Sequence, residues 1–398
     1  MKYFCSLLFD TASATVLAAV FLALSLTTGF SQERQKILIE QYAEGRPIPV
    51  SLSGFTGEAA SALKFDLEIA GFDVVNGDAA QYQITGSNNG RLEGHVTDRI
   101  SQAHVLDRAY EKGTARAQAH AFADDIVKAI TGKPGIAQTK IAFKGETANG
   151  SEVYMADYDG HNAVGLTKDG NLVAAPCWMP GRRVIYYTSY RLGNPDIYSY
   201  DLDTGARKIV ARYSGLNTSA ALSADGRRLA MIMSKAGSPD LYVADADGTN
   251  LRQLTKTKED ESSPCWSPDG RTICFVSRAG GRAALYTIPA AGGTMQRLKT
   301  AGVSSPTEPD WSPDGKSIVF TSYSGASNFN ICIVPAEGGD ASVVAAGEDP
   351  SWAPNSRTVI FARRKAGKRV LSLLDVPTKR VKDAAQNMGS RSQPNWAK

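Results

Sequence analysis

The sequence predicts an all-β six-bladed β-propeller preceded by a small α/β N-terminal domain. A tryptophan-centred unit recurs roughly every 44 residues towards the end of the chain, and this period is typical of one four-stranded blade. Short apolar strands alternate there with turns rich in Gly, Pro and Asp, as expected of blades. The units begin Trp178-Met-Pro-Gly-Arg, Leu222-Ser-Ala-Asp-Gly, Trp266-Ser-Pro-Asp-Gly, Trp311-Ser-Pro-Asp-Gly, Trp352-Ala-Pro-Asn-Ser and Trp396-Ala-Lys.

Each unit has the same internal order of strand and turn. Trp266 ends an apolar strand, and Ser267–Gly270 predicts a turn, because Pro presets φ, Asp accepts backbone hydrogen bonds and Gly permits positive φ. Apolar strands are then expected at Thr272–Val276 and Ala284–Ile288. We interpret the repeated Trp and Asp residues as structural, since one Asp per blade at one turn position is not a paired acid and base.

The sixth unit stops after its first strand, which indicates how the ring closes. We expect the strand at Gln393–Trp396 to complete a blade whose other strands come from residues 140–167.

The N-terminus predicts export. Lys2 precedes the apolar run Val16–Leu26, which is too short to span a bilayer comfortably, and small residues follow it. We expect a signal peptide at 1–31, an N-terminal α/β domain at 32–135 and the propeller at 136–398, in a monomeric periplasmic protein; an uncleaved anchor is the alternative. The net charge of +4 is weak and scattered, so no nucleic-acid partner is expected.

The region before the propeller has a different sequence pattern, with helical spacing of apolar residues. Apolar spacing predicts helices at Glu58–Ala70 and Thr114–Ile130, with Gly71 and Gly132 as their stops. Strands are expected around them, and His95, His104 and His120 are interpreted as structural. The expected strands are Lys36–Glu40, Pro47–Leu52, Phe72–Val75, Gln81–Thr85, Arg91–Val96 and Ala103–Asp107.

Five cysteines are present. Cys5 is expected to leave with the signal peptide, and Cys177, Cys265, Cys274 and Cys332 remain. Cys265 and Cys274 flank one turn, so a disulfide between them and a pair of buried free thiols are both open interpretations.

An enzyme is the competing class, because such propellers also cap serine peptidases. That reading needs a Gly-x-Ser-x-Gly nucleophile elbow, which the sequence lacks, and His161 is the one propeller histidine; we therefore expect no enzyme and no catalytic residues. A third reading is a non-catalytic propeller that binds a carbohydrate or another envelope ligand, with Tyr190, Tyr213 and Tyr323 as candidate contacts.

Several segments resemble the TolB family, the periplasmic components of the Tol–Pal envelope system of Gram-negative bacteria. The order of export signal, α/β domain and Trp-Ser-Pro-Asp-Gly propeller is similar, and the resemblance covers nearly all of the mature chain. The segments that carry it beyond the repeat are Gly45–Val50, Asp66–Phe72, His120–Gly132, Thr139–Phe143 and Ala156–Asn162.

The resemblance implies a protein-binding scaffold on which a Pal-like peptidoglycan-associated lipoprotein docks over the propeller funnel. It implies roles in outer-membrane integrity, cell division and protein import, and a TolA-like partner for the arm Gln32–Ile39. Leu216 stands where the family often presents a His. The implied funnel residues are Leu216, Asn217, Thr218, Ser219, Asp260, Glu261, Ser262, Ser263, Thr307, Glu308, Glu348 and Asp349.

The acidic members of this set predict a negative funnel mouth. Such a mouth would attract a basic partner surface or an adventitious calcium ion, although no cofactor or metal is expected to be part of the protein. The acidic residues are Asp260, Glu261, Glu308, Glu348 and Asp349.

Overall fold

The computed structural model describes residues 42, 45–325, 328–385 and 389–398. The expected signal peptide, the strand at Lys36–Glu40, the arm Gln32–Ile39 and Cys5 lie outside the described residues. Among the described residues, no helix combines the length and the apolar character needed to cross a bilayer.

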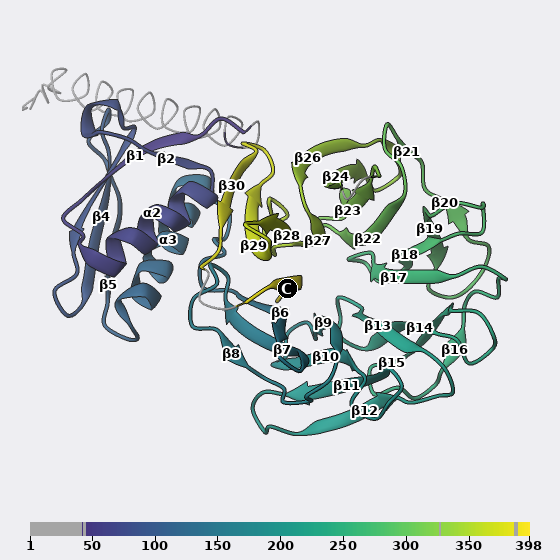
Figure 1. Ribbon diagram of the computed structural model, residues 1–398. Coiled ribbons are helices and arrows are strands. Elements are labelled where there is room, and N and C mark those ends of the chain that lie inside the picture. The colour runs from purple at the N-terminus through teal and green to yellow at the C-terminus, as the bar shows by residue number, and fades with distance from the viewer. Residues whose placement is uncertain (1–41, 43–44, 326–327, 386–388) are drawn as a thin grey trace, which may run out of the picture.

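The N-terminal part is a five-stranded sheet in the order β2-β1-β3-β4-β5. Its two helices pack against each other and lie between this sheet and the rest of the molecule (Figure 1). The elements are β1 Ile48–Ser53, α2 Gly57–Ile69, β2 Phe72–Val74, the short 3₁₀ turn Gly77–Ala79, β3 Tyr82–Ser87, β4 Leu92–Asp98, β5 His104–Tyr110 and α3 Ala115–Thr131.

Both helices begin and end where the sequence indicates. Thr114 caps α3, because its side chain accepts a hydrogen bond from the Ala117 N–H at 3.2 Å. Gly132 ends the same helix in the left-handed conformation, with φ of 71°. Gly71, with φ of 89°, turns the chain after α2.

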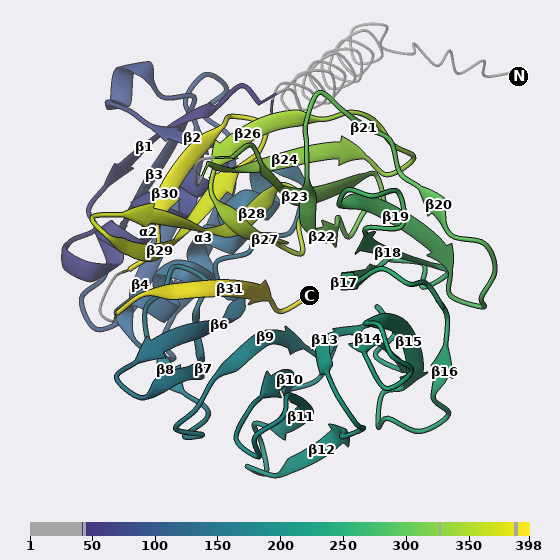
Figure 2. The same cartoon turned by 45° about the vertical axis from the view of Figure 1, so that its right-hand side comes forward.

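The remaining chain forms six four-stranded antiparallel sheets arranged in a ring (Figures 1 and 2), which confirms the predicted fold class. We number the blades from the first complete unit. Blade 1 contains β9 Val173–Trp178, β10 Val184–Ser189, β11 Asp196–Asp201 and β12 Arg207–Ala211; blade 2 contains β13 Asn217–Leu222, β14 Arg228–Met233, β15 Asp240–Asp245 and β16 Arg252–Gln253; blade 3 contains β17 Glu261–Trp266, β18 Thr272–Ser277, β19 Ala284–Pro289 and β20 Gln296–Arg297.

The other three blades follow the same plan. A two-stranded parallel pair, β21 Thr300–Ala301 and β25 Gly339–Asp340, borders blade 4. Blade 4 contains β22 Pro306–Trp311, β23 Ser317–Tyr323, β24 Phe329–Pro335 and β26 Ser342–Ala346; blade 5 contains β27 Glu348–Trp352, β28 Thr358–Lys365, β29 Lys368–Asp375 and β30 Arg380–Asp383; blade 6 contains β31 Arg391–Trp396, β6 Lys140–Thr147, β7 Gly150–Asp157 and β8 Val164–Gly165.

Blade 6 closes the ring by mixing the two ends of the propeller chain. Its inner strand β31 pairs antiparallel with β6, with Trp396 opposite Ile141, and Figure 2 shows the last strand beside β6 with the C-terminus near the ring centre. The expected closure strand at Gln393–Trp396 therefore lies where the repeat count placed it.

The ring has two faces, an entry face and an exit face. The entry face is where the inner strands begin; it carries the loops that lead into them and the turns between the second and third strands. The exit face is where the inner strands end; it carries the turns that follow the motif residues and the turns between the third and fourth strands.

The N-terminal domain shares its hydrophobic core with blades 5 and 6. One continuous cluster includes Phe122 and Ile126 of α3 together with Leu371 of blade 5 and Trp396 of blade 6. Polar contacts come from exit-face turns and from the outer strand β30 of blade 5. Arg357 is one example: its guanidinium donates to the Tyr42 carbonyl at 2.7 Å and lies 3.7 Å from the Tyr42 ring centroid.

Candidate functional site

A β-bulge interrupts the inner strand of every blade at the same point. The register against the second strand shifts there in all six sheets. One residue of each inner strand, the third in five blades and the second in blade 5, adopts positive φ, which non-glycine residues seldom do. These residues are Ala175 (48°), Ser219 (56°), Ser263 (50°), Glu308 (53°), Asp349 (57°) and Gln393 (50°).

The six bulged residues meet around the ring axis. All of them line one central cavity of about 660 Å³. The cavity continues past the inner strands to exit-face turn residues such as Pro180, Pro268 and Pro313. The bulge therefore turns one side chain per blade towards a shared channel.

On one side of the channel, the bulged side chains bind the backbone of the next blade. The Glu308 carboxylate accepts from the Asp349 N–H at 3.0 Å, and the Asp349 carboxylate accepts from the Gln393 N–H at 2.9 Å. The Gln393 amide oxygen in turn accepts from the Ala175 N–H at 2.9 Å. Blades 4, 5, 6 and 1 are thus joined by consecutive side chain–backbone hydrogen bonds, which rigidify the channel.

A second level of contacts lies one step nearer the exit face. Asp310 accepts from the Trp352 N–H at 2.7 Å, and Asn395 accepts from the Trp178 N–H at 2.9 Å. The Lys398 ammonium lies 2.7 Å from an Asp310 oxygen, so the chain end itself occupies the channel.

One carboxyl group in the channel, that of Asp349, has a shifted pKa. Burial, reinforced by the neighbouring Glu308 carboxylate, raises the pKa of Asp349 well above its ordinary value. Two carboxyls that share a desolvated site do not both ionise readily, and a proton on Asp349 reduces the repulsion between them.

The expected funnel residues lie at different depths along the ring axis. Ser219, Ser263, Glu308 and Asp349 line the channel, whereas the others lie nearer the entry face. Leu216, Thr218, Ser262, Thr307 and Glu348 are half-buried there, and Asp260 is exposed.

Two expected funnel residues lie away from the channel. Glu261 is only 1% exposed, and its carboxylate accepts from Thr255 at 2.5 Å and from Thr257 at 2.8 Å. Asn217 is fully buried and bonds to the backbone of Pro195 and Tyr213. Both stand first in their inner strands, where the side chain points into the blade to satisfy loop hydroxyls and carbonyls.

The expected negative mouth is also wrong. Glu261 is buried, Glu308 and Asp349 lie inside the channel, and Glu348 pairs with Arg369 at 2.5 Å. Of the five acidic residues, only Asp260 is exposed.

The tyrosines proposed for carbohydrate binding lie near the entry face but differ in their exposure to solvent. Tyr213 and Tyr323 are 40% and 42% exposed, and Tyr190 is half-buried. The Lys235 ammonium lies 4.5 Å from the Tyr213 ring centroid, and Tyr323 packs at 5.2 Å against Phe329.

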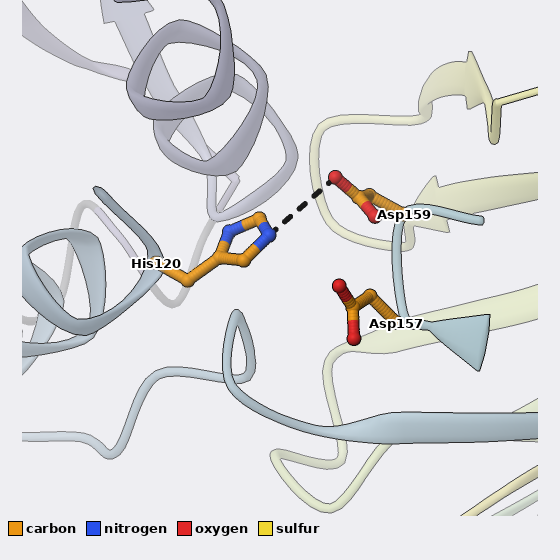
Figure 3. Close-up of side chains that lie close together, drawn as sticks. All are labelled: His120, Asp157 and Asp159. Carbon is orange, nitrogen blue, oxygen red and sulfur yellow. Dashed lines mark ion pairs between the residues drawn. The ribbon is translucent and has the colours of Figure 1, made fainter. Parts of the chain in front are cut away.

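A second polar cluster is buried between the N-terminal domain and blade 6. His120 of α3 faces Asp159 and Asp157, which follow β7 or end it (Figure 3). Their ligand atoms all lie within 4.8 Å of one another. However, Arg116 donates to Asp159 and Lys140 donates to Asp157, so cationic side chains already compensate both carboxylates, and the cluster acts as an interdomain ion-pair network.

Burial and partners set the protonation of this network. Burial opposes the charge on His120, but the hydrogen bond and charge of Asp66, with Asp159 beyond them, raise the His120 pKa above its ordinary value. Burial also raises the pKa of Asp66, although hydrogen bonds from His120 and Tyr158 lower it. Both directions mean that the folded interface holds its proton more tightly than the unfolded chain does.

The structure shows how Cys265 and Cys274 lie relative to each other. Cys265 and Cys274 lie directly opposite each other on β17 and β18, and both are buried free thiols. Burial raises the pKa of Cys265 well above its ordinary value, with Cys274 adding to the effect.

The bulge is the functional feature that sequence reasoning missed. Its signal was present: a Pro follows the bulged residue in five of the six units, as in Ser263-Pro264 and Gln393-Pro394, and Ala220 replaces it in blade 2. Asp310, Gln393, Asn395 and Lys398 were likewise not expected in the channel.

Comparisons with known proteins agree with this architecture. A family model described as the TolB beta propeller domain matches residues 127–398. The Tol-Pal system protein TolB of Anaeromyxobacter dehalogenans (strain 2CP-1) is 31% identical over 262 residues, covering 56% of this chain and 60% of that protein. The Tol-Pal system protein TolB of Alcanivorax borkumensis is 31% identical over 167 residues, covering 39% of this chain and 38% of the relative.

The matched parts therefore span less than two thirds of the length of these relatives. Among solved structures, TolB from Acinetobacter baumannii has a TM-score of 0.81 at 23% identity, covering 88% of this chain and 97% of that one. At that identity the likeness shows the fold alone. Because the family model covers more than half of the sequence, the chain belongs to the TolB beta-propeller family.

Proposed function

We propose that this protein is a non-catalytic, periplasmic docking scaffold of the Tol–Pal envelope system. In this role it binds a Pal-like peptidoglycan-associated lipoprotein at the entry face of the propeller, above the channel. It would thereby support outer-membrane integrity, cell division and protein import. A TolA-like inner-membrane protein is the proposed partner of the N-terminal arm.

The observation that carries this proposal is the preformed channel. One bulged residue per blade faces it, and side chain–backbone hydrogen bonds across three blade junctions hold the frame. A rigid frame that presents loops from six blades can grip a partner without losing conformational entropy of its own. The interdomain contacts come from exit-face turns, as at Arg357, and from strand β30, which leaves the entry-face loops to a partner.

The channel chemistry supports binding in preference to catalysis. The Glu308 and Asp349 carboxylates already accept hydrogen bonds from backbone N–H groups, and Asp310 pairs with Lys398. Groups held in this way position the backbone of neighbouring blades. A calcium ion in the channel stays a prediction, and the proposal does not depend on it.

The test is calorimetric binding of the organism's own Pal-like lipoprotein, without its lipid anchor, to the mature protein. Ser263→Arg places a long side chain in the channel at a position whose backbone remains unchanged, and we expect at least about a tenfold loss of affinity. Ala291→Arg is the matched control, because Ala291 is exposed in an exit-face turn of the same blade; its affinity should equal that of the wild type.

Failure of the wild-type protein to bind would contradict the proposal. Binding of peptidoglycan fragments or another glycan in its place would favour the alternative, a propeller that recognises an envelope carbohydrate.

A further inference from the structure

The turns between the second and third strands carry charge of one sign. Across the six blades these turns are residues 148–149, 190–195, 234–239, 278–283, 324–328 and 366–367, and none contains Asp or Glu. Exposed cations stand in or next to the turns of blades 1, 2, 3 and 5. These are Arg191, Lys235, Arg278, Arg282, Arg364, Lys365 and Lys368.

The loops leading into the inner strands add to this charge. Lys168, Arg212, Lys256 and Lys258 are exposed there, against exposed Glu259 and Asp260. Other carboxylates near this face are paired with cations: Asp169 with Arg207 at 2.7 Å, Asp196 with Arg212 at 3.5 Å, and Asp383 with Lys365 at 2.7 Å. Glu146, next to the blade 6 turn, is exposed. The exposed cations outnumber the exposed acids, so the entry face has a net positive charge, although the whole chain carries only +4.

The exit face provides an internal comparison. The motif turns of blades 2, 3 and 4 place an exposed acid and an exposed base within three residues, at Asp225 and Arg227, Asp269 and Arg271, and Asp314 and Lys316. The motif turn of blade 1 has exposed Arg182 and Arg183, and Arg183 pairs with Asp203 of the neighbouring exit-face turn at 2.7 Å. Charges of both signs at such spacing largely cancel at a distance. The cationic character is thus a property of one face and not of propeller turns in general.

Apolar side chains accompany the cations. Leu172 and Leu192 are 50% and 48% exposed near blade 1, Tyr213 is exposed on the loop that leads into blade 2, and Tyr323 is exposed at the end of β23 in blade 4. Exposed Tyr and Arg beside apolar groups are typical of protein-binding surfaces. The turns of blades 4 and 6 contain only small or polar residues, so the cations form an arc with gaps and not a complete ring. Such an arc favours a protein surface with its own charge pattern over a uniformly charged surface such as a lipid bilayer.

We propose that the entry face docks an acidic protein surface: the partner presents carboxylates to the arc of Arg and Lys while apolar groups cover Leu192 and Tyr213. This inference rests on the proposed function and specifies the chemistry of its partner. Charges at the rim of an interface act mainly on the association rate and its salt dependence. The association rate should therefore fall steeply with ionic strength.

The experiment measures association rates with the same lipid-free Pal-like protein, from about 50 to about 300 mM salt. Reversing the blade 3 turn with Arg278→Glu and Arg282→Glu should slow association about tenfold or more at low salt. The matched control reverses two exposed cations of the exit face, Arg227→Glu and Arg271→Glu, and should change the rate less than about twofold.

A second entry-face variant, Lys256→Glu with Lys258→Glu, reverses charge at a different loop, so a local folding defect in the blade 3 turn would not affect it. The melting temperature of each variant shows whether it is folded. If the partner binds but no entry-face reversal differs from the exit-face control, this inference is overturned while the proposed function stands. If the wild type binds no such partner, the proposed function itself fails.

Lipid vesicles test whether the cationic face binds an anionic membrane and not a protein. If vesicles containing about one-third phosphatidylglycerol bind the wild type, and the reversals abolish that binding while leaving protein binding unchanged, the cationic face serves a lipid surface and the inference is overturned.

Discussion

Deleting residues 391–398 removes the inner strand of blade 6 and should destabilise the whole propeller. Trp396 is 1% exposed; its indole N–H donates to the Thr139 hydroxyl at 2.7 Å and its ring packs on Tyr158. Truncating such a buried Trp costs about 3–5 kcal/mol. The deletion also removes buried Arg391 and exposes the inner edge of β6.

The expected loss can be compared with the stability of the fold. A net stability of about 5–15 kcal/mol is typical, so the loss of Trp396 together with a whole paired strand should remove most of it. We expect the truncated chain to lose its cooperative thermal transition, followed by near-ultraviolet circular dichroism. The graded variant Trp396→Ala should lower the melting temperature by roughly 5–10 °C.

Trp311→Ala is the matched control for the graded variant. Trp311 holds the same motif position in blade 4, is only half-buried, and its indole donates to Gly315 within its own blade. Its loss should cost less, because it joins neither the chain ends nor the two domains. A truncated protein that melts like the wild type would refute the closure argument.

Three further predictions concern protonation, thiols and the domain interface. Because the pKa of His120 is raised in the folded protein, its stabilising contribution is complete below the unfolded histidine value of about 6.5 and is lost as pH rises through the raised value. The raised pKa of Asp66 acts in the same direction from a lower pH, because its contribution is complete only below the unfolded aspartate value of about 3.9. The melting temperature should therefore fall as the pH rises above about 6.5, and His120→Gln should flatten the wild-type slope there. Buried Cys265 and Cys274 should resist maleimide until the protein is denatured and then both react, whereas a disulfide would leave both unlabelled by intact mass. Arg357 pairs with the buried Asp375 carboxylate at 2.5 Å and 3.0 Å. Arg357→Ala leaves this carboxylate without its cation and should cost about 3–5 kcal/mol in denaturant unfolding, and Arg357→Lys should restore only part of the loss. Unfolding of Arg357→Ala at the same denaturant concentration as the wild type would contradict this pairing.

The features that could be predicted from sequence are those with a repeating or local cause. A motif that recurs once per blade gives the number of blades, independently of the side chains between its copies. An incomplete last unit implies that the other strands of its blade come from another part of the chain. Thr114 and Gly132 mark the ends of α3 because capping depends on the nearest backbone groups. The fold could therefore be predicted closely.

The candidate site was harder, because its geometry depends on contacts between blades. Glu261 turns inward to meet Thr255 and Thr257, whereas Glu308 lines the channel. Locally, the two differ only in their position in the unit and in the proline that follows Glu308. The bulge that separates them results from pairing with the second strand and from the following proline. Lys398 enters the channel only because ring closure brings the chain end to the axis.

The recurring bulge also determines how the channel could acquire new specificity. Ala, Ser, Glu, Asp and Gln all occupy it with nearly the same φ, so the backbone at this level does not depend on which side chain projects from it. β-branched residues are disfavoured by that conformation, but most others are admissible. Ala175, Ser219 and Ser263 can thus be exchanged without losing a bond to the next blade, whereas Glu308, Asp349 and Gln393 also hold the backbone of the neighbouring blade. A designer could test a library of channel linings at the first three positions without redesigning a blade.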